Sequence, residues 1–323
     1  MTIKKIYLPR IINNDELNTI KGQYLDDEFI LHTIQTDTDV YEEDTNILVC
    51  SFRKKRLKNN SLAWDNYKDL SVPARGRGAA AGPVDASSVY WSKRTLHKTQ
   101  GYKTGYMKAD GTPSKMSVNN TVCSSPLGYY EAQKALGYDK PCRLTFNTKN
   151  HMEQYEKGIP YIQEIDKWYK KLHTSHYKIQ KERADKQPKY RIADTAFSTI
   201  TINRNFRTGL HQDAGDFGGY AMLSVLEYGS YSGGIFMIPA FGIGIDLRQG
   251  DVLCARVAEY HCNTDIYTNT SQDEYNASLP QVFKKDTKVG VLGLDKDYSR
   301  ISFVSYLREK INECDLSMEV LII

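Results

Sequence analysis

A series of short apolar strands follows residue 190, and it constrains the fold more than any other feature of the chain. The segments are FSTITIN, YAMLSVLEY, GGIFMIP, IGIDL, DVLCARV, KVGVLGL and RISFVSYL. Turn signals such as GDFGG, YSGG, PAFG and RQGD separate them. Short antiparallel strands at this spacing are typical of a jelly roll or a double-stranded β-helix.

A helical pattern precedes these strands, from about Met152 to Arg183. Apolar side chains recur there at three- and four-residue steps and form one stripe: Ile162, Ile165, Trp168, Tyr169, Leu172, His176 and Ile179. A helix with a single apolar stripe buries it against another element. We therefore predict an α+β protein with a double-stranded β-helix (jelly-roll, cupin-like) core and flanking helices packed on one sheet.

Composition sets the compartment and the class of partner. The formal net charge of +4 permits a polyanionic partner but does not demand one. The six cysteines include no CxxC pair, which favours reduced thiols in an intracellular protein. The start of the sequence does not resemble a signal peptide, and no stretch reaches the ~20 apolar residues of a membrane helix. We expect a soluble protein of the cytoplasm or nucleus.

A candidate metal site lies in the segment FRTGLHQDAGD. His211 and Asp213 are two residues apart, so on an extended chain both side chains point to the same side. His261, in EYHCNT, is the best candidate for a third ligand. Two histidines and one carboxylate with open positions opposite are typical of non-haem Fe(II) oxygenases. Alone, an HxD pair is more often a surface or capping feature, so the rest of the sequence has to support this interpretation.

Arg300 begins the last strand, and Ser302 shares its face. If the strands close into a barrel with the metal site at its mouth, 2-oxoglutarate would chelate the iron and leave one position for O2. Its distal carboxylate then needs a cation, and a guanidinium binds a carboxylate with two parallel hydrogen bonds. Arg300 and Ser302 are the predicted cosubstrate residues, although Arg300 taken alone could equally be a surface residue.

Two upstream segments could approach a ligand. The Gly/Ala-rich run PARGRGAAAGP, residues 73–83, is either a flexible connection or a loop folded against the site that presents Arg75 or Arg77. Residues 90–115 interleave basic and aromatic side chains, as a nucleic-acid surface would, but an ordinary polar hairpin has the same composition. A polar stretch at 265–286 is too long for a hairpin turn and is interpreted as a lid or a disordered insertion.

The run AFSTITINRNFRTGLHQDAGDFGG, with YSGGIFMIPAFG, RQGDVL and RISFVSY, resembles the TET/JBP family of Fe(II)/2-oxoglutarate dioxygenases, and most closely the J-binding-protein thymine hydroxylases. RGRGAAAGP and PCRLTFN are also similar to family segments. The likeness spans roughly residues 73–308. We therefore expect an N-terminal extension at 1–72, a dioxygenase domain at 73–310 with its core at about 193–310, and a C-terminal tail at 311–323.

The resemblance implies iron ligands at His211, Asp213 and His261, and 2-oxoglutarate binding by Arg300 beside Ser302. It also implies O2 as cosubstrate, with ascorbate as a candidate reductant, and hydroxylation of the 5-methyl group of a pyrimidine in DNA. The base, thymine or 5-methylcytosine, would have to be flipped out of the duplex.

The expected substrate-binding residues are Asp216, Arg207, Arg77 and Asn205. Asp216 would accept a hydrogen bond from thymine N3–H or from the amino group of 5-methylcytosine, or it could cap a turn. Asn205 and Arg207 either brace the loop or touch substrate, and bracing is favoured for the asparagine. The alternatives are an oxygenase of the same fold that acts on a protein, nucleotide or small molecule, and a catalytically inactive nucleic-acid-binding module.

Overall fold

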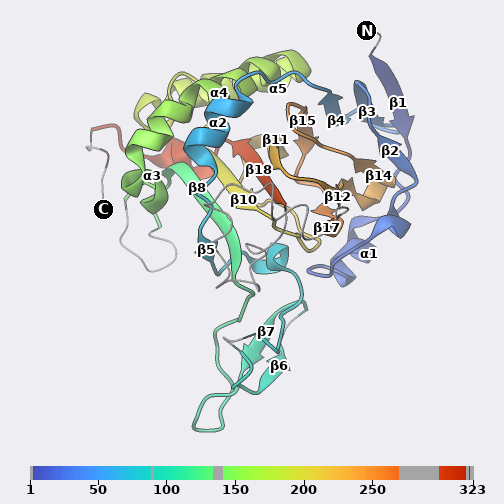
Figure 1. Cartoon of the computed structure of the whole chain (residues 1–323), viewed down its shortest axis with the longest axis vertical. Helices are drawn as coiled ribbons and strands as arrows, with labels where there is room; N and C mark the ends of the chain where they lie inside the picture. Colours follow the sequence, from blue (N-terminus) through green and yellow to red (C-terminus); the bar gives the residue numbers. More distant parts are fainter. Residues whose placement is uncertain are drawn as a thin grey trace.

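The computed structural model describes residues 3–88, 91–99, 101–133, 141–268, 298–317 and 320. A long curved sheet crosses the body, a smaller sheet lies beside it, and helices cover the opposite face of the long sheet (Figure 1). A narrow hairpin projects from the body at the other end of the molecule from the helices (Figure 1). The chain therefore combines a layered α+β body with one projecting element.

The long sheet has ten strands and is antiparallel except where its first strand pairs with β3. In spatial order the strands are β1 (Lys4–Leu8), β3 (Thr38–Glu42), β4 (Leu48–Arg53), β15 (Val252–Arg256), β11 (Tyr220–Tyr228), β18 (Ser299–Tyr306), β10 (Thr199–Arg204), β8 (Val122–Tyr130) and β5 (Pro73–Ala74), with β9 (Arg143–Leu144) beside β8. Strands from the two ends of the chain thus meet in one sheet.

The second sheet has four strands in the order β16 (Cys262–Asn263), β13 (Phe236–Ile238), β14 (Ile243–Ile245) and β2 (His32–Ile34). β12 (Tyr231–Gly233) and β17 (Ile266–Thr268) pair with each other as a separate two-stranded antiparallel sheet. One buried cluster contains side chains from both larger sheets, such as Val225 and Leu253 with Met237 and Ile243. The two sheets therefore pack face to face.

Successive side chains of the central strands enter two different apolar clusters, which explains why the sequences of these strands are nearly continuous apolar runs. In β15, Leu253 and Ala255 join the cluster between the sheets, whereas Val252 and Cys254 join the cluster beneath the helices. Successive side chains on a strand point to opposite faces. Both faces of these strands are covered, so neither set of positions can be polar without a partner.

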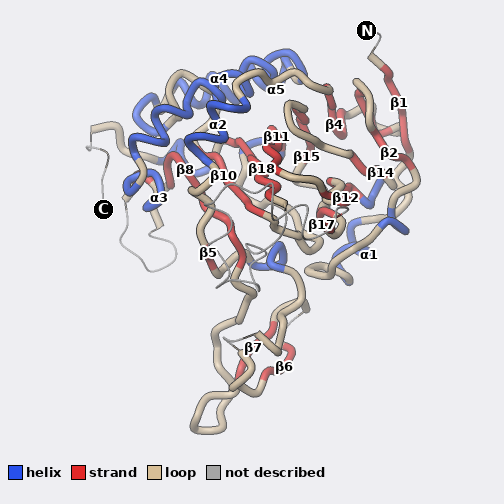
Figure 2. Tube along the Cα trace, in the orientation of Figure 1, coloured by secondary structure: helices blue, strands red, loops and turns tan. Residues whose placement is uncertain are grey.

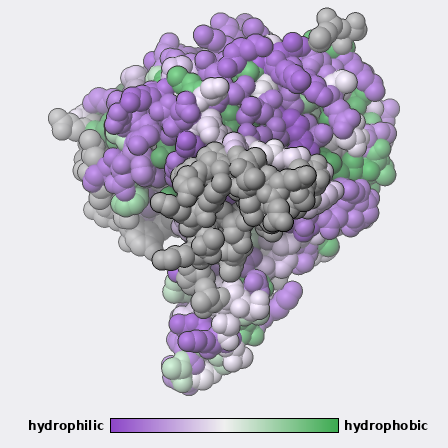
Figure 3. All heavy atoms as spheres, in the orientation of Figure 1, coloured by the Kyte–Doolittle hydropathy of each residue, from purple (hydrophilic) through white to green (hydrophobic). Residues whose placement is uncertain are grey.

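Three helices cover the outer face of the long sheet: α2 (Asn60–Tyr67), α4 (Met152–Leu172) and α5 (Thr174–Asp185) (Figure 2). The predicted stripe packs on the sheet through Ile162, Ile165 and Tyr169 of α4. The helix does not continue unbroken, because His173 leaves the helical conformation and α5 starts a new direction. Ile179, predicted to belong to the stripe, is 58% exposed. The outer surface of this layer is hydrophilic (Figure 3).

The residues before position 73 are integrated into the body. They supply β1, β3 and β4 to the long sheet and β2 to the smaller one, and α2 joins the cluster beneath α4. At the other end, the 3₁₀ helix Glu309–Glu313 packs through Ile311, which is 1% exposed. The domain boundaries at 72 and 310 remain predictions from sequence, because the structure shows packing and not independent folding.

One expectation about the cysteines is wrong. Cys142 forms a disulfide with Cys314 across a sequence separation of 172 residues, whereas all six thiols were expected to be reduced. Cys50, Cys254 and Cys262 are buried free thiols. The pairing was not foreseeable because neither cysteine lies in a short-spaced motif and the two meet only through the fold.

Two sequence predictions fall where the structure gives no description. The segment KVGVLGL and most of the polar stretch at 265–286 lie within residues 269–297, outside the described residues. Among the helices that are described, none has the length and apolar content needed to cross a membrane.

Candidate functional site

Backbone pairing brings the three predicted metal ligands together. His211 and His261 form a reciprocal bridge: each backbone N–H donates to the other's carbonyl oxygen, at 3.0 and 2.8 Å. The Asp213 N–H donates to the Val257 carbonyl at 3.0 Å, which fixes the next turn of the loop. Potential ligand atoms of His211, Asp213 and His261 all lie within 4.8 Å of one another. Segments fifty residues apart in sequence thus supply one cluster.

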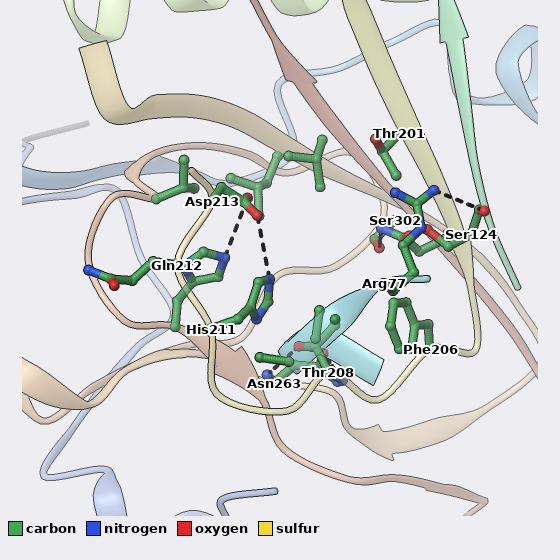
Figure 4. A pocket seen from close by; sticks show the side chains of 18 of the residues that line it. Arg77, Ser124, Thr201, Phe206, Thr208, His211, Gln212, Asp213, Asn263 and Ser302 are labelled. Atoms are coloured by element: carbon green, nitrogen blue, oxygen red, sulfur yellow. Dashed lines mark hydrogen bonds and ion pairs between the residues drawn. The ribbon is translucent and has the colours of Figure 1, made fainter. Parts of the chain in front are cut away.

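Both imidazole rings are oriented by hydrogen bonds on the side away from the cluster. The Nδ1 atom of His211 lies 2.8 Å from the Gly209 carbonyl, and Nδ1 of His261 lies 2.9 Å from the Glu259 carbonyl. A carbonyl can only accept, so each Nδ1 carries the proton and each Nε2 keeps a lone pair. Both Nε2 atoms lie 3.6 Å from the Asp213 carboxylate (Figure 4). This is the arrangement that metal-binding histidines adopt.

The electrostatics of the cluster also suit a cation. Burial opposes ionisation of Asp213, but its contact with His261 and the nearby charges lower its pKa to about 2. Burial, followed by the neighbouring His261, lowers the pKa of His211 to about 4. Burial also disfavours the charged form of His261, yet contact with the Asp213 carboxylate outweighs it and raises that pKa. A carboxylate that stays ionised beside a neutral imidazole is a suitable donor set for Fe(II).

The cluster lies on one side of a cavity of about 510 Å³. Alternate residues of β18 line this cavity: Arg300, Ser302, Val304, Tyr306 and the following Arg308. Their neighbours Ile301 and Phe303 point the other way, into the cluster beneath the helices. The cavity is large enough for a small ligand beside a metal ion.

Arg300 has the surroundings expected of an anion-binding side chain. It is 6% exposed, and its Nε has no hydrogen-bond partner among the described residues. No acidic side chain in the described part of the chain forms an ion pair with it. Gly234, which follows β12, has a φ of +68° that side chains rarely adopt, and a Cβ there would lie only 3.1 Å from Arg300 Nε, so glycine favours this close approach to the guanidinium. A buried unpaired cation is costly unless a ligand neutralises it. The residues present therefore fit an oxo-acid.

Polar side chains beside Arg300 form a connected set. The Ser124 hydroxyl donates to Asn203 Oδ1 at 2.5 Å, and Asn203 Nδ2 lies 3.5 Å from the Ser302 hydroxyl. All three residues line the cavity. Ser302 therefore keeps the place predicted for it beside Arg300.

The upstream Gly/Ala-rich loop folds against the cavity. Residues 76–80 line it, and Arg77 donates from Nη2 to the Ser124 carbonyl at 3.0 Å (Figure 4). In Figure 4 the Arg77 side chain lies next to Ser302 and Phe206, across the cavity from His211. Arg75 is exposed and does not line the cavity. Of the two candidate guanidinium groups, the structure brings only Arg77 into the site.

Asp216 also lines the cavity. Burial, followed by the charge of Asp213, raises its pKa well above the usual range of a carboxyl. Its backbone forms a bridge with Arg308, whose guanidinium pairs with Glu131 at 2.6 Å. Sequence reasoning missed Glu131 and Arg308. The two-residue period that joins Arg300 to Ser302, continued to position 308, would have found the arginine.

Two predicted substrate residues do not reach the cavity. Arg207 forms ion pairs with Asp26 at 2.7 Å and Asp265 at 3.5 Å, and its side chain is held there. Asn205 has a φ of +46°, and its Oδ1 accepts from the Arg300 backbone N–H at 2.7 Å. Neither residue lines the cavity. These contacts brace the loop after β10, which is the role favoured for the asparagine, and a substrate-binding role for either residue stays a prediction.

The chain is similar to a known protein family and to several of its members. Residues 125–309, more than half of the chain, match the family model Tet_JBP, described as the oxygenase domain of the 2OGFeDO superfamily. The bifunctional helicase and thymine dioxygenase JBP2 of Leishmania tarentolae is 35% identical over 141 residues, which are 43% of this chain and 12% of the relative. The thymine dioxygenase JBP1 of Trypanosoma brucei brucei is 30% identical over 174 residues, which are 54% of this chain and 20% of the relative.

A solved structure, NgTET1 in complex with 5mC DNA, is 12% identical, with a TM-score of 0.48 over 93% of each chain. The match to the two curated relatives covers at most 20% of their length. Both relatives are therefore much longer than the region they share with this chain.

Proposed function

The chain belongs to the Tet/JBP family of oxygenase domains, in the superfamily of 2-oxoglutarate- and Fe(II)-dependent dioxygenases, and from this premise we propose that it hydroxylates the 5-methyl group of thymine or 5-methylcytosine in DNA. Two relatives are named thymine dioxygenases, which supports a pyrimidine methyl group as the target. The observation that carries the proposal is the His211–Asp213–His261 cluster facing the same cavity as Arg300, which is buried and has no ion-pair partner among the described residues.

The residues of the cluster have distinct tasks. Nε2 of His211, Nε2 of His261 and the Asp213 carboxylate would hold Fe(II), and the two Nδ1 hydrogen bonds keep the rings aimed at it. With 2-oxoglutarate and O2, the bound iron supplies an oxidant strong enough to replace a C–H hydrogen by hydroxyl, while the oxo-acid becomes succinate and CO2. The protein supplies position and excludes water, which protects the reaction from side products.

The distal carboxylate of 2-oxoglutarate would bind Arg300, with Ser302 as a second donor. A guanidinium and a carboxylate match in a planar, two-bond geometry. Asn205 holds the Arg300 backbone, and Asn203 contacts the Ser302 hydroxyl, so both donors are positioned before the ligand arrives. Positioning in advance avoids reorganisation when the ligand binds.

The pyrimidine would enter beside Asp216 and Arg77. The Asp216 carboxyl can accept through its unprotonated oxygen from thymine N3–H or from the amino group of 5-methylcytosine, so both bases remain candidates. A base inside a duplex cannot reach a buried metal cluster, so the target must be flipped out, at a cost of a few kcal/mol. The cavity of about 510 Å³ can accommodate a single base together with 2-oxoglutarate.

For the fold we propose a double-stranded β-helix within residues 193–310 of a catalytic domain that spans 73–310. Face-to-face packing of the long and four-stranded sheets supports it, as does the site between their ends. In such a fold the inner faces of the strands carry the ligands and the outer faces carry the core under the helices. The alternation of β18 and β10 residues fits that division.

The test is mass spectrometry of nucleosides from duplex DNA containing thymine and 5-methylcytosine, incubated with protein, Fe(II), 2-oxoglutarate, O2 and ascorbate. We expect hydroxymethyluracil or hydroxymethylcytosine, with one succinate for each hydroxylated base. Matched incubations without 2-oxoglutarate, or with Asp213→Ala, should give neither product. Succinate formed only with a protein, nucleotide or small molecule would contradict DNA as the substrate. No succinate with any substrate from the iron-loaded protein would contradict an oxygenase and favour a binding module.

A further inference from the structure

The projecting hairpin carries the molecule's excess positive charge. We define the arm as residues 85–118, of which 85–88, 91–99 and 101–118 are described; they include β6 (Leu96–Lys98) and β7 (Thr104–Tyr106), and most of them extend away from the body (Figure 1). The arm contains six lysines and arginines and two aspartates, so its net charge is +4. This equals the formal net charge of the whole chain, so the remaining residues sum to zero.

The cations of the arm are available to a partner. All six are exposed: Lys93, Arg94, Lys98, Lys103, Lys108 and Lys115. None of the five lysines forms an ion pair with any residue that the structure describes. The two acids are occupied locally, because Asp110 accepts from Thr112 and Asp85 accepts from Ser87. The arm therefore presents charge that no part of the described molecule neutralises.

Two aromatic residues of the arm contact each other within it. Trp91 and Tyr106 stack with ring centroids 6.3 Å apart. Arg94 lies 4.7 Å from the Tyr106 ring, and Arg75 lies 5.9 Å from the Trp91 ring. Sequence composition alone allowed these rings to be stacking platforms for bases, but in the fold they contact each other and two arginines. The surface that remains is cationic, which suits phosphate groups more than unstacked bases.

The arm is joined to the cavity at two places. It leaves the body directly after residues 76–80, which line the cavity. The turn between β6 and β7 contacts the body, and Tyr102 in this turn lines the same cavity. Gly22 allows that contact, since a Cβ there would lie 2.8 Å from the Tyr102 Cβ. A polyanion bound along the arm would therefore lead to the mouth of the cavity.

We propose that the arm is a clamp for the phosphate backbone of duplex DNA that flanks the target base. This inference rests on the proposed function, and it adds that recognition of the flanking duplex is electrostatic and independent of base sequence. Each lysine that neutralises a phosphate releases condensed counterions, so binding through the arm must weaken as salt rises. A free nucleotide, which has no flanking backbone, would gain nothing from the arm.

The test compares two triple variants of the full chain, K98Q/K103Q/K108Q on the arm and K167Q/K170Q/K178Q on the helical layer. All six lysines are exposed, and the two sets lie at opposite ends of the molecule. Both variants lose the same charge, so a general effect of net charge would appear in both. Fluorescence anisotropy with a labelled 30-base-pair DNA duplex at several salt concentrations gives the affinity and its salt dependence.

We expect the arm variant to bind the duplex about tenfold to a hundredfold more weakly at low salt, with a salt slope shallower by about three. The helical-layer variant should bind as the unmodified protein does. Equal affinity and slope in the two variants would overturn the proposal, provided that both melt at the unmodified temperature. Tighter binding of duplex RNA than of duplex DNA through the arm would overturn the assignment to DNA.

The outcomes separate this proposal from the proposed function. If the unmodified protein oxidises DNA but the arm variant binds it normally, the arm proposal fails alone. If the arm variant loses affinity but the unmodified protein yields no hydroxymethyl nucleoside, the clamp stands and the proposed reaction fails.

Discussion

The cavity and the arm use positive charge in opposite ways. In the cavity, Arg300 is 6% exposed and its backbone N–H donates to Asn205, and Arg308 is paired with Glu131. On the arm, lysines extend into solvent without partners among the described residues. A buried cation is fixed and can position one carboxylate, whereas exposed cations attract a polyanion over a distance and tolerate many registers. The difference assigns selectivity for a small ligand to the cavity and affinity for DNA to the arm.

The strongest test removes a ligand from the cluster. Asp213→Ala deletes the carboxylate of the cluster. The weaker metal binding should remove several kcal/mol of transition-state stabilisation and lower the hydroxylation rate at least about a thousandfold. Duplex affinity should not change, because the arm is intact. Rates come from nucleoside mass spectrometry and affinities from anisotropy, with Asp194→Ala, an exposed acid outside the cavity, as control. Parallel loss of rate and DNA affinity would remove the distinction between the two regions.

Breaking the disulfide should affect the body and spare the arm. Cys314→Ser opens a link across 172 residues and should lower the free energy of unfolding by about 2–4 kcal/mol. Thermal melts of the variant and of the reduced unmodified protein should agree, both below the oxidised protein by several degrees. The salt slope for duplex binding should stay the same. Identical melting of oxidised and reduced protein would show that the link contributes nothing to the body.

Arg300 sharpens the comparison within the cavity. Arg300→Gln removes the buried cation, and loss of a charge-assisted hydrogen bond of about 1.5–3 kcal/mol should raise the KM for 2-oxoglutarate roughly tenfold to a hundredfold. Ser302→Ala should have a smaller effect in the same direction. Steady-state succinate formation measures both. An unchanged KM in Arg300→Gln would mean that another cation, such as Arg77, binds the oxo-acid.

The smallest expected effect concerns pH and His173, whose ring lies against those of His176 and Tyr220. Burial, with a smaller contribution from His176, lowers the pKa of His173 from 6.5 to about 4. The unfolded chain then holds the proton more tightly than the folded one. The free energy of unfolding should therefore fall as the pH drops from about 6.5 towards 4, by about 1 kcal/mol after discounting for partial exposure.

Chemical denaturation at pH 7 and pH 5 measures this change, with His173→Gln as the comparison. The variant should lose less stability over that interval than the unmodified protein. Equal losses would place the pH dependence elsewhere in the body.

Sequence reasoning reached the strands and the cluster because both follow short-range rules. The HxD spacing and the two-residue period of the last strand depend only on extended backbone geometry. The break at His173 and the exposure of Ile179 escaped it, because an unbroken helical period does not reveal a change of direction. Integration of β1 and β4 into the long sheet, and the Cys142–Cys314 pair, depend on contacts between distant segments that no local pattern encodes.

The sequence was also insufficient to assign a role to the arm. Its composition matched a nucleic-acid surface and a polar hairpin equally well. Only coordinates show that Trp91 and Tyr106 stack on each other while the lysines remain exposed. The sequence gives the number of charges on the arm, but it does not show that the lysines lack ion-pair partners among the described residues.

The central claim is that the chemistry resides in the His211–Asp213–His261 cluster and not on the arm. Counting iron per chain after anaerobic reconstitution and desalting tests it most directly, in the unmodified protein, in Asp213→Ala and in K98Q/K103Q/K108Q. We predict close to one ion in the unmodified protein and in the arm variant, and little in Asp213→Ala. Full iron retention in Asp213→Ala would contradict the account.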